Sequence, residues 1–186
     1  TVSSHKLGGP QGAGALAVLD GQPVGPLLSG GGQERKQRAG TENVPAIAGF
    51  GAAAAAARAD LERMAGLADW RDRLEVEARA LCPQVQLHGV DAPRLPNTAC
   101  LGLPGVRAET QVMALDLAGV AVSSGSACSS GKVHASHVLR AMGVTEADAG
   151  SAVRVSLGWD SGPGDVDAFL DAWTKLVRKH GLAAAA

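Results

Sequence analysis

Cys128 stands in a segment whose composition suits a reactive thiol better than a packed one. Residues 123–131 are almost all serine, glycine or alanine, and Lys132 and His134 follow closely. A thiol becomes a nucleophile when it is accessible and lies near positive charge. The pattern therefore predicts an activated thiol at Cys128.

Lys6 follows His5 in a loop rich in glycine and proline, where no regular helix is expected. A lysine that acts as a Schiff-base nucleophile needs such a constrained position, where its ammonium group can lose a proton. Ser3, Ser4, His5 and the nearby glycine amides could also donate hydrogen bonds to an anion. The spacing alone leaves two interpretations open, a nucleophilic lysine and a solvated one.

Arg154 lies between Val153 and Val155 in a segment that alternates like a half-buried strand. A charge at such a position either faces solvent or is paired in a cleft. The local pattern does not decide between these two positions.

Two phosphate-binding patterns are only near matches. Residues 125–132 resemble a Walker A loop, but five residues rather than four separate the glycines, and Val133 replaces the expected Ser or Thr. Residues 49–54 match G-x-G-x-x-A within an alanine-rich helix, where we expect the glycines to allow close helix packing. The histidines show no zinc-type spacing with the cysteines, so no structural metal site is predicted.

The composition of the 186 residues excludes several classes of protein. The 17 Lys and Arg against 18 Asp and Glu give a net charge of −1, so nucleic acid is not an expected partner. No apolar run reaches the roughly 18 residues of a membrane helix, which argues against a membrane span. Three cysteines fit neither a C-x-x-C metal pair nor a disulfide framework, so we expect a reducing, cytoplasmic setting. Cys82 and Cys100 are interpreted as small core hydrophobes.

Helices and strands are expected between these segments. The apolar run at residues 15–19 predicts a strand, and Thr41 or Asn43 can cap a long helix that reaches about Leu81, with an interruption at Gly66. Further strands are expected at 85–88, 98–103, 120–122 and 153–157, and further helices at 108–117, after a Ser136 cap, and at 166–177.

Three segments that occur in one order carry a family resemblance. They are SSHKLGGPQGAGAL at residues 3–16, GGGQERKQRAGTEN at 30–43 and SSGSACSSG at 123–131. Together with RVSLG at 154–158, they resemble the cysteine desulfurases of the NifS/IscS type, a group of class-V aminotransferases. The resemblance covers nearly the whole chain, and its motifs are specific in combination.

The resemblance implies pyridoxal 5'-phosphate as the cofactor, held by Lys6, with Ser3 and His5 at its phosphate. It also implies a homodimer in which Thr41 completes the phosphate site of the partner subunit. Arg154 would pair with the carboxylate of the substrate, which favours a cleft for this arginine.

The same resemblance implies that Cys128 attacks the sulfur of L-cysteine, leaving L-alanine and a persulfide on Cys128. The persulfide sulfur would pass to an iron–sulfur scaffold protein or another acceptor, and Cys128 would be a transient iron–sulfur ligand.

The implied fold class is α/β, the pyridoxal-phosphate-dependent transferase fold type I. The half of the family that precedes the lysine motif is absent, so residues 1–60 would be the end of the large cofactor-binding domain with its linking helix. Residues 61–186 would be the small domain that carries the cysteine loop, and activity would need the missing half. Two alternatives stay open: a non-catalytic sulfur-relay or interaction module, and a selenocysteine lyase-like relative.

Overall fold

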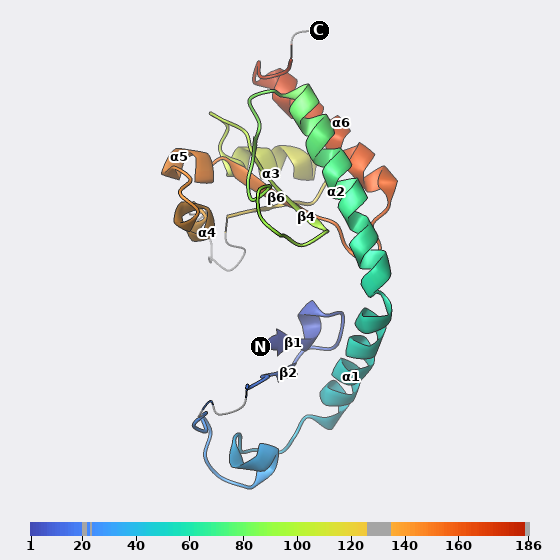
Figure 1. Cartoon of the computed structure of the whole chain (residues 1–186), viewed down its shortest axis with the longest axis vertical. Coiled ribbons are helices and arrows are strands. Elements are labelled where there is room, and N and C mark those ends of the chain that lie inside the picture. The colour runs from blue at the N-terminus through green and yellow to red at the C-terminus, as the bar shows by residue number, and fades with distance from the viewer. Residues whose placement is uncertain (20–21, 23, 126–134, 185–186) are drawn as a thin grey trace. The chain divides into compact units, whose positions relative to one another are not determined.

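The computed structural model describes residues 1–19, 22, 24–125 and 135–184 (Figure 1). The chain divides into two compact units, Thr1–Glu62 (unit 1) and Arg63–Ala186 (unit 2). Each unit is described by itself.

Unit 1 is built around a short two-stranded ribbon and one helix. Strand β1 (Val2–Ser3) pairs with β2 (Gly14–Ala15) in antiparallel fashion, and the 3-10 turn η1 (Ser4–Lys6) lies between them. A second turn, η2 (Gln33–Lys36), precedes helix α1 (Val44–Ala59). The strand expected at residues 15–19 is wrong beyond Ala15. No described strand pairs with the apolar residues that follow, and Leu19 is 81% exposed.

The long helix expected before Leu81 is two helices that meet at Asp60 rather than at Gly66. Asn43 caps α1, because its Oδ1 accepts a hydrogen bond of 3.3 Å from the Ala46 N–H. Asp60 ends α1 with its N–H bonded to the Ala56 carbonyl, and α2 (Leu61–Leu81) then continues through Gly66. A glycine inside a helix costs only about 1 kcal/mol relative to alanine. Burial of the next residue, Leu67, outweighs that cost.

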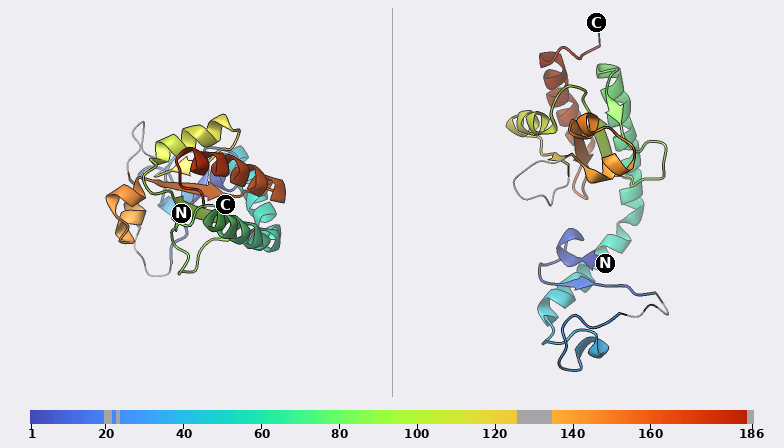
Figure 2. Two further views of the ribbon diagram at one scale, coloured as in Figure 1. Left: turned by 90° about the horizontal axis from the view of Figure 1, so that it is seen from above. Right: turned by 90° about the vertical axis from the view of Figure 1, so that its left-hand side faces the viewer.

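In its described residues, unit 2 contains an antiparallel sheet of order β3–β4–β6–β5 and five helices. Figures 1 and 2 show helices of this unit gathered around the sheet. The strands are β3 (Gln86–Leu87), β4 (Thr98–Gly102), β5 (Ser123–Ser124) and β6 (Ala152–Ser156). Beside α2, the described helices of this unit are α3 (Ala108–Leu117), α4 (His137–Ala141), α5 (Glu146–Ala149) and α6 (Pro163–Lys179).

The two faces of this sheet differ in what covers them. Side chains of β4 and β6 on one face, among them Leu101 and Val153, pack with α2, α3 and α6 in one core that includes Trp173. Cys82 also lies in this core and is fully buried, which confirms its interpretation as a core hydrophobe. On the other face, α4 and α5 contribute only a small cluster around Leu139.

Most of the elements expected in unit 2 are confirmed, with one strand displaced. The helix expected at 108–117 is α3, and Ser136 caps α4 by accepting a bond of 3.4 Å from the Leu139 N–H. The strand expected at 120–122 is wrong. Val120 instead completes the end of α3, with its N–H 2.9 Å from the Leu115 carbonyl, and pairing with β6 begins only at Ser123.

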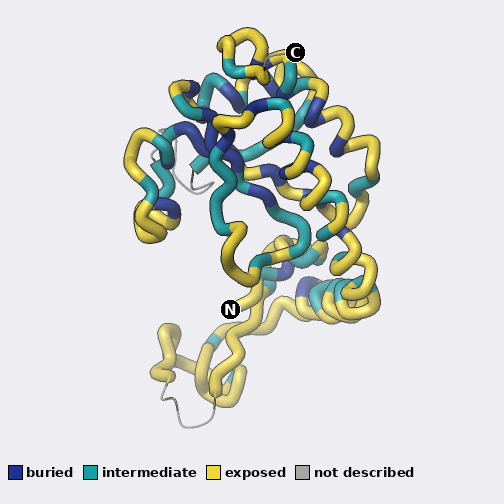
Figure 3. The backbone as a smooth tube through the Cα atoms, turned by 45° about the horizontal axis from the view of Figure 1, so that its top comes forward, coloured by how far each residue is buried: buried dark blue, intermediate teal, exposed yellow. Residues whose placement is uncertain are grey.

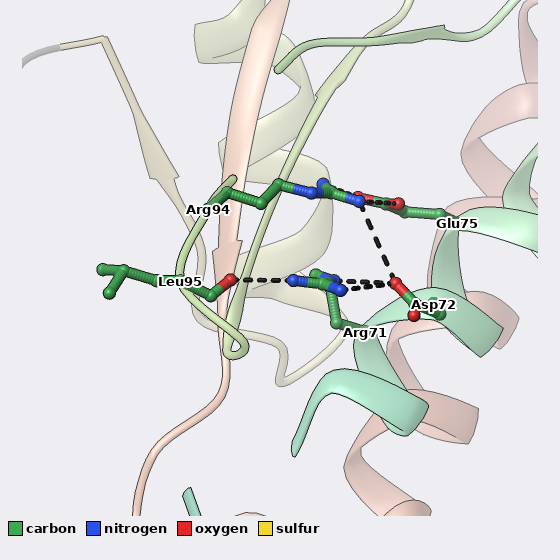
Figure 4. Close-up of polar contacts among 5 residues, drawn as sticks. All are labelled: Arg71, Asp72, Glu75, Arg94 and Leu95. Carbon is green, nitrogen blue, oxygen red and sulfur yellow. Dashed lines mark hydrogen bonds and ion pairs between the residues drawn. The ribbon is translucent and has the colours of Figure 1, made fainter. Parts of the chain in front are cut away.

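An ion-pair cluster fastens the β3–β4 connection to α2 (Figure 4). Arg94 donates two hydrogen bonds to the Glu75 carboxylate, of 2.5 and 2.6 Å, and Arg71 donates to the Leu95 carbonyl at 2.8 Å. The Glu75 side chain is only 7% exposed. Because an unpaired buried carboxylate is costly, this bidentate pair holds the connection in one position.

None of the described helices is both long and apolar enough to cross a membrane.

Candidate functional site

The turn that carries Lys6 is closed by hydrogen bonds to one residue, Ser4. The Ser4 N–H donates to the Ala13 carbonyl at 3.1 Å, and the Ser4 carbonyl accepts from Leu7 and Gly9, each at 2.9 Å. These bonds and the β1–β2 pairing fix both ends of the segment between Ser3 and Gly14. The position of Lys6 is therefore set by the backbone.

Glycines allow helix α1 to pack directly against this turn. A Cβ at Gly9 would overlap Ser4 Oγ and lie 3.2 Å from Ala53 Cβ, and a Cβ at Gly49 would lie 2.7 Å from Pro10 Cγ. The expectation of close helix packing is confirmed for Gly49 and is wrong for Gly51, where a Cβ would meet no atom within 4 Å. The close contacts at Gly9 and Gly49 hold the side of the turn that faces α1, which is called its inner side below.

The residues predicted to bind an anion differ in how accessible they are in this packed turn. Ser3 is half-buried, and His5 and Lys6 are exposed on consecutive positions of η1. Ser4 is fully buried, and its hydroxyl has no hydrogen-bond partner. Ser3, His5 and Lys6 thus remain at least partly accessible on one short segment, whereas Ser4 is buried and not accessible to a ligand.

Thr41 lies in another part of unit 1. It is exposed and lines an open pocket of about 970 Å³ whose other walls include Gly14, Leu16, Arg38 and Ile47. Of the described residues that line this pocket, none belongs to η1. The structure therefore does not bring Thr41 and Lys6 of one chain to a common pocket.

In unit 2, Arg154 projects from the face of the sheet that the main core does not cover. Its neighbours Val153 and Val155 are buried in the core, whereas Arg154 is exposed. Five other arginines of this unit form ion pairs with carboxylates: Arg71, Arg73, Arg94, Arg107 and Arg140. Among the described residues, Arg154 has no hydrogen bond or ion pair from its side chain, so its charge is available to a ligand.

The strand register places two short side chains beside Arg154, a serine and a cysteine. The cysteine, Cys100, is only half-buried and packs against the cluster around Leu139, so its interpretation as a core hydrophobe is confirmed in part. Cys100 is the Cα partner of Arg154 on β4, and Ser123 is the Cα partner of Arg154 on β5. Residues directly opposite each other in antiparallel strands point to the same face. Burial raises the pKa of the Cys100 thiol, and the nearby charge of Arg154 only partly opposes that shift.

Cys128, Lys132 and His134 lie outside the described residues. The structure does describe strand β5, which ends at Ser124, four residues before Cys128. That strand pairs with β6 at Val153 and Arg154.

Sequence reasoning missed the grouping of Cys100 and Ser123 with Arg154. The alternation within a strand tells which residues share a face of that strand, but it does not reveal which residues of other strands lie opposite. Across the parts of the chain that the structure describes, no group of three or more His, Cys, Asp or Glu side chains is placed to hold a metal ion.

Comparisons with known proteins give a consistent result. The family model described as Aminotransferase class-V matches residues 1–169. A cysteine desulfurase of Cereibacter sphaeroides is 42% identical over 177 residues, which cover 95% of this chain and 45% of that relative. A cysteine desulfurase of Sinorhizobium fredii is 42% identical over 180 residues, which cover 96% and 46%.

Among solved structures, a NifS-like protein from Rickettsia africae superposes with a TM-score of 0.83 and 36% identity. The match covers 95% of this chain and 46% of that structure. The expected fold class, the α/β fold of NifS-like pyridoxal phosphate enzymes in part, is confirmed. The chain spans slightly less than half the length of the relatives it matches.

Proposed function

Since the chain belongs to the class-V aminotransferase family, we propose that it carries the cofactor lysine and the sulfur-accepting cysteine of a cysteine desulfurase. Its substrate is L-cysteine, and its products are L-alanine and a persulfide on Cys128. Support comes from the relatives named cysteine desulfurase, which match 95% or more of the chain.

The observation that carries this proposal is the way in which the Lys6 turn is held. Its inner side is clamped by Gly9 and Gly49 against α1, and its outer side presents His5 and Lys6. A lysine that serves only as a solvated surface charge does not need a fixed position. A lysine that must meet a bound carbonyl carbon needs one, because covalent chemistry depends on the position of the reacting atoms.

The donor set of this turn fits pyridoxal 5'-phosphate. The amine of Lys6 can bind an aldehyde carbon, and the Ser3 hydroxyl and the His5 ring can donate to the phosphate. When bound, the cofactor supplies an electron sink for the bonds at the substrate's Cα. Thr41 completes the phosphate site of the partner subunit, which accounts for its lining a pocket without Lys6 within one chain, and the active form is a homodimer.

Arg154 binds the carboxylate of L-cysteine. A guanidinium group is suited to this task because it stays ionised and can form two parallel hydrogen bonds with a carboxylate. Its lack of an acidic partner among the described residues leaves both bonds to the substrate.

Cys128 receives the sulfur. Its thiolate attacks the substrate sulfur, an S–S bond forms as the C–S bond breaks, and the carbon that loses sulfur gains a proton. The atoms and electrons balance without another oxidant, since one thiol and L-cysteine become a persulfide and L-alanine. The persulfide then delivers sulfur in the cytoplasm to an iron–sulfur scaffold or another acceptor protein, with Cys128 as a transient ligand of the cluster.

The proposal is tested with the chain combined with the preceding half of a cysteine desulfurase relative and with pyridoxal phosphate, because activity is expected to need that half. We expect a visible absorbance band that changes when L-cysteine is added, and a mass increase of one sulfur on the peptide containing Cys128. Lys6→Ala should abolish the band, and Lys36→Ala, a change in η2 of the same unit, should retain it.

A band that persists in Lys6→Ala would overturn the assignment of Lys6. A sulfur added without any band would favour the sulfur-relay alternative, and a strong preference for selenocysteine over cysteine would favour the lyase alternative.

A further inference from the structure

The face of the sheet that carries Arg154 is covered at Ala152 and Cys100 by the cluster around Leu139, and it is open at Arg154 and Ser156, which are exposed. Cys100 and Ser123 flank Arg154 across the strands, and Ala152 and Ser156 are the next residues of β6 on that face. None of these side chains is long enough to cover a guanidinium group. The face therefore leaves room for a ligand to lie on Arg154.

The two flanking side chains differ in what they can give to an anion. Ser123 is half-buried and, within the described ranges, its side chain has no hydrogen-bond partner, so its hydroxyl proton is free to be donated. The Cys100 thiol is a weak donor. Burial raises its pKa, so it stays neutral and does not compete with a ligand for the charge of Arg154.

We propose that Ser123 is a second binding residue for the substrate's carboxylate, donating its hydroxyl proton to the carboxylate that Arg154 binds. This inference rests on the proposed function, because that function makes the ligand of Arg154 an α-amino acid. The two donors are held by the β5–β6 pairing, Ser123 opposite Arg154 and Ser124 opposite Val153.

This arrangement has a consequence for specificity. A guanidinium alone attracts any anion, whereas a guanidinium with a hydroxyl fixed beside it orients a planar carboxylate. Ser123 therefore favours a carboxylate over anions of other shapes, whereas discrimination against an amide comes from Arg154, because an amide carries no charge for the guanidinium to bind.

The test uses the full chain without cofactor and L-alanine as the probe, since L-alanine keeps the α-carboxylate and carries no thiol. Binding is followed by NMR through the amide signals of residues 123 and 154. L-alanine should shift both signals, and L-alaninamide should shift neither. Ser123→Ala should weaken L-alanine binding about tenfold, the usual worth of a hydrogen bond to a charged group.

Two variants serve as controls. Ser123→Thr keeps a hydroxyl and should restore binding, which a purely structural role for the serine would not require. Ser124→Ala changes the next residue, which points to the opposite face, and should bind like the unchanged chain.

The possible failures are distinguishable. Equal binding by Ser123→Ala and Ser124→Ala would overturn the role of Ser123 and leave that of Arg154 intact. Unchanged binding by Arg154→Gln, or no shift at residue 154 with L-alanine, would overturn the carboxylate site itself and with it this part of the proposed function.

Discussion

The two units of this chain owe their order to different forces. Unit 2 has a continuous apolar core in which Trp173 and Leu101 are fully buried. In the described part of unit 1, the one buried apolar side chain is that of Ala46, while Leu27 is 93% exposed. Figure 3 shows that most of the N-terminal part of the chain is coloured as exposed. Unit 1 is held instead by backbone hydrogen bonds at Ser4 and by close glycine contacts with α1.

This difference means that the carboxylate site and the lysine turn of the proposed function stand on units of different stability. The carboxylate site at Arg154 stands on a sheet that has its own core, so unit 2 can hold it in place. The lysine turn stands on a unit that buries very little apolar surface, and a region of about 60 residues without a core is marginal by itself. We therefore expect unit 1 to depend on further polypeptide surface for its stability.

The largest expected effect on stability comes from removing a large side chain from the core of unit 2. Trp173→Ala should lower the free energy of unfolding by about 3–5 kcal/mol, because it leaves a large cavity. Leu27→Ala, in unit 1, should change it by no more than about 0.5 kcal/mol. Urea unfolding followed by tryptophan fluorescence measures the free energy of unfolding of unit 2, since all three tryptophans lie in that unit. Far-UV circular dichroism follows unit 1 as well, and an equal loss from both variants would show that unit 1 has a core of its own.

A smaller effect on stability is expected from adding a methyl group at the close contact between Gly9 and Ser4 in unit 1. Gly9→Ala places a methyl group against Ser4 Oγ and should destabilise the turn by about 1–3 kcal/mol. The amides of residues 7 and 9, which donate to the Ser4 carbonyl, should then exchange with solvent faster. Gly32→Ala meets no atom within 4 Å and is the matched control. Unchanged exchange in Gly9→Ala would mean that the glycine contact does not order the turn.

The smallest effect concerns the pH dependence of stability, and it is confined to unit 2 because the half-buried histidine, His88, belongs to that unit. Burial lowers the pKa of His88 below its ordinary value of 6.5, and the charge of Asp148 only partly offsets this shift. The unfolded chain therefore binds the proton more readily, so stability falls as pH drops below about 6.5 towards the folded pKa.

Unfolding of unit 2 measured between pH 7.5 and 5 should show this loss, and His88→Gln should reduce it. His180→Gln, near the end of α6, should keep the dependence of the unchanged chain. The same slope in His88→Gln and the unchanged chain would assign the loss to other groups.

Much of the local structure followed from the sequence because it depends on neighbours along the chain. The spacing of apolar residues predicted α3 at 108–117, and Ser136 and Asn43 were recognisable as caps. The displaced elements show where that reasoning stops. The apolar run after Ala15 has no strand to pair with, and the helix break falls at Asp60, although Gly66 has the poorer intrinsic propensity.

For the candidate site, the sequence by itself determined which residues can do chemistry. Lys6, Cys128 and Arg154 stand out by residue type and local surroundings, and the family follows from their motifs taken in order.

Only the tertiary structure decided what lies beside those residues. It buried Ser4 fully and Ser3 only in part, and it brought Cys100 and Ser123 to the two sides of Arg154. The physical reason is that strand register and helix packing join residues far apart in the chain. Those contacts depend on the balance of burial and hydrogen bonding over a whole unit, which no local pattern records.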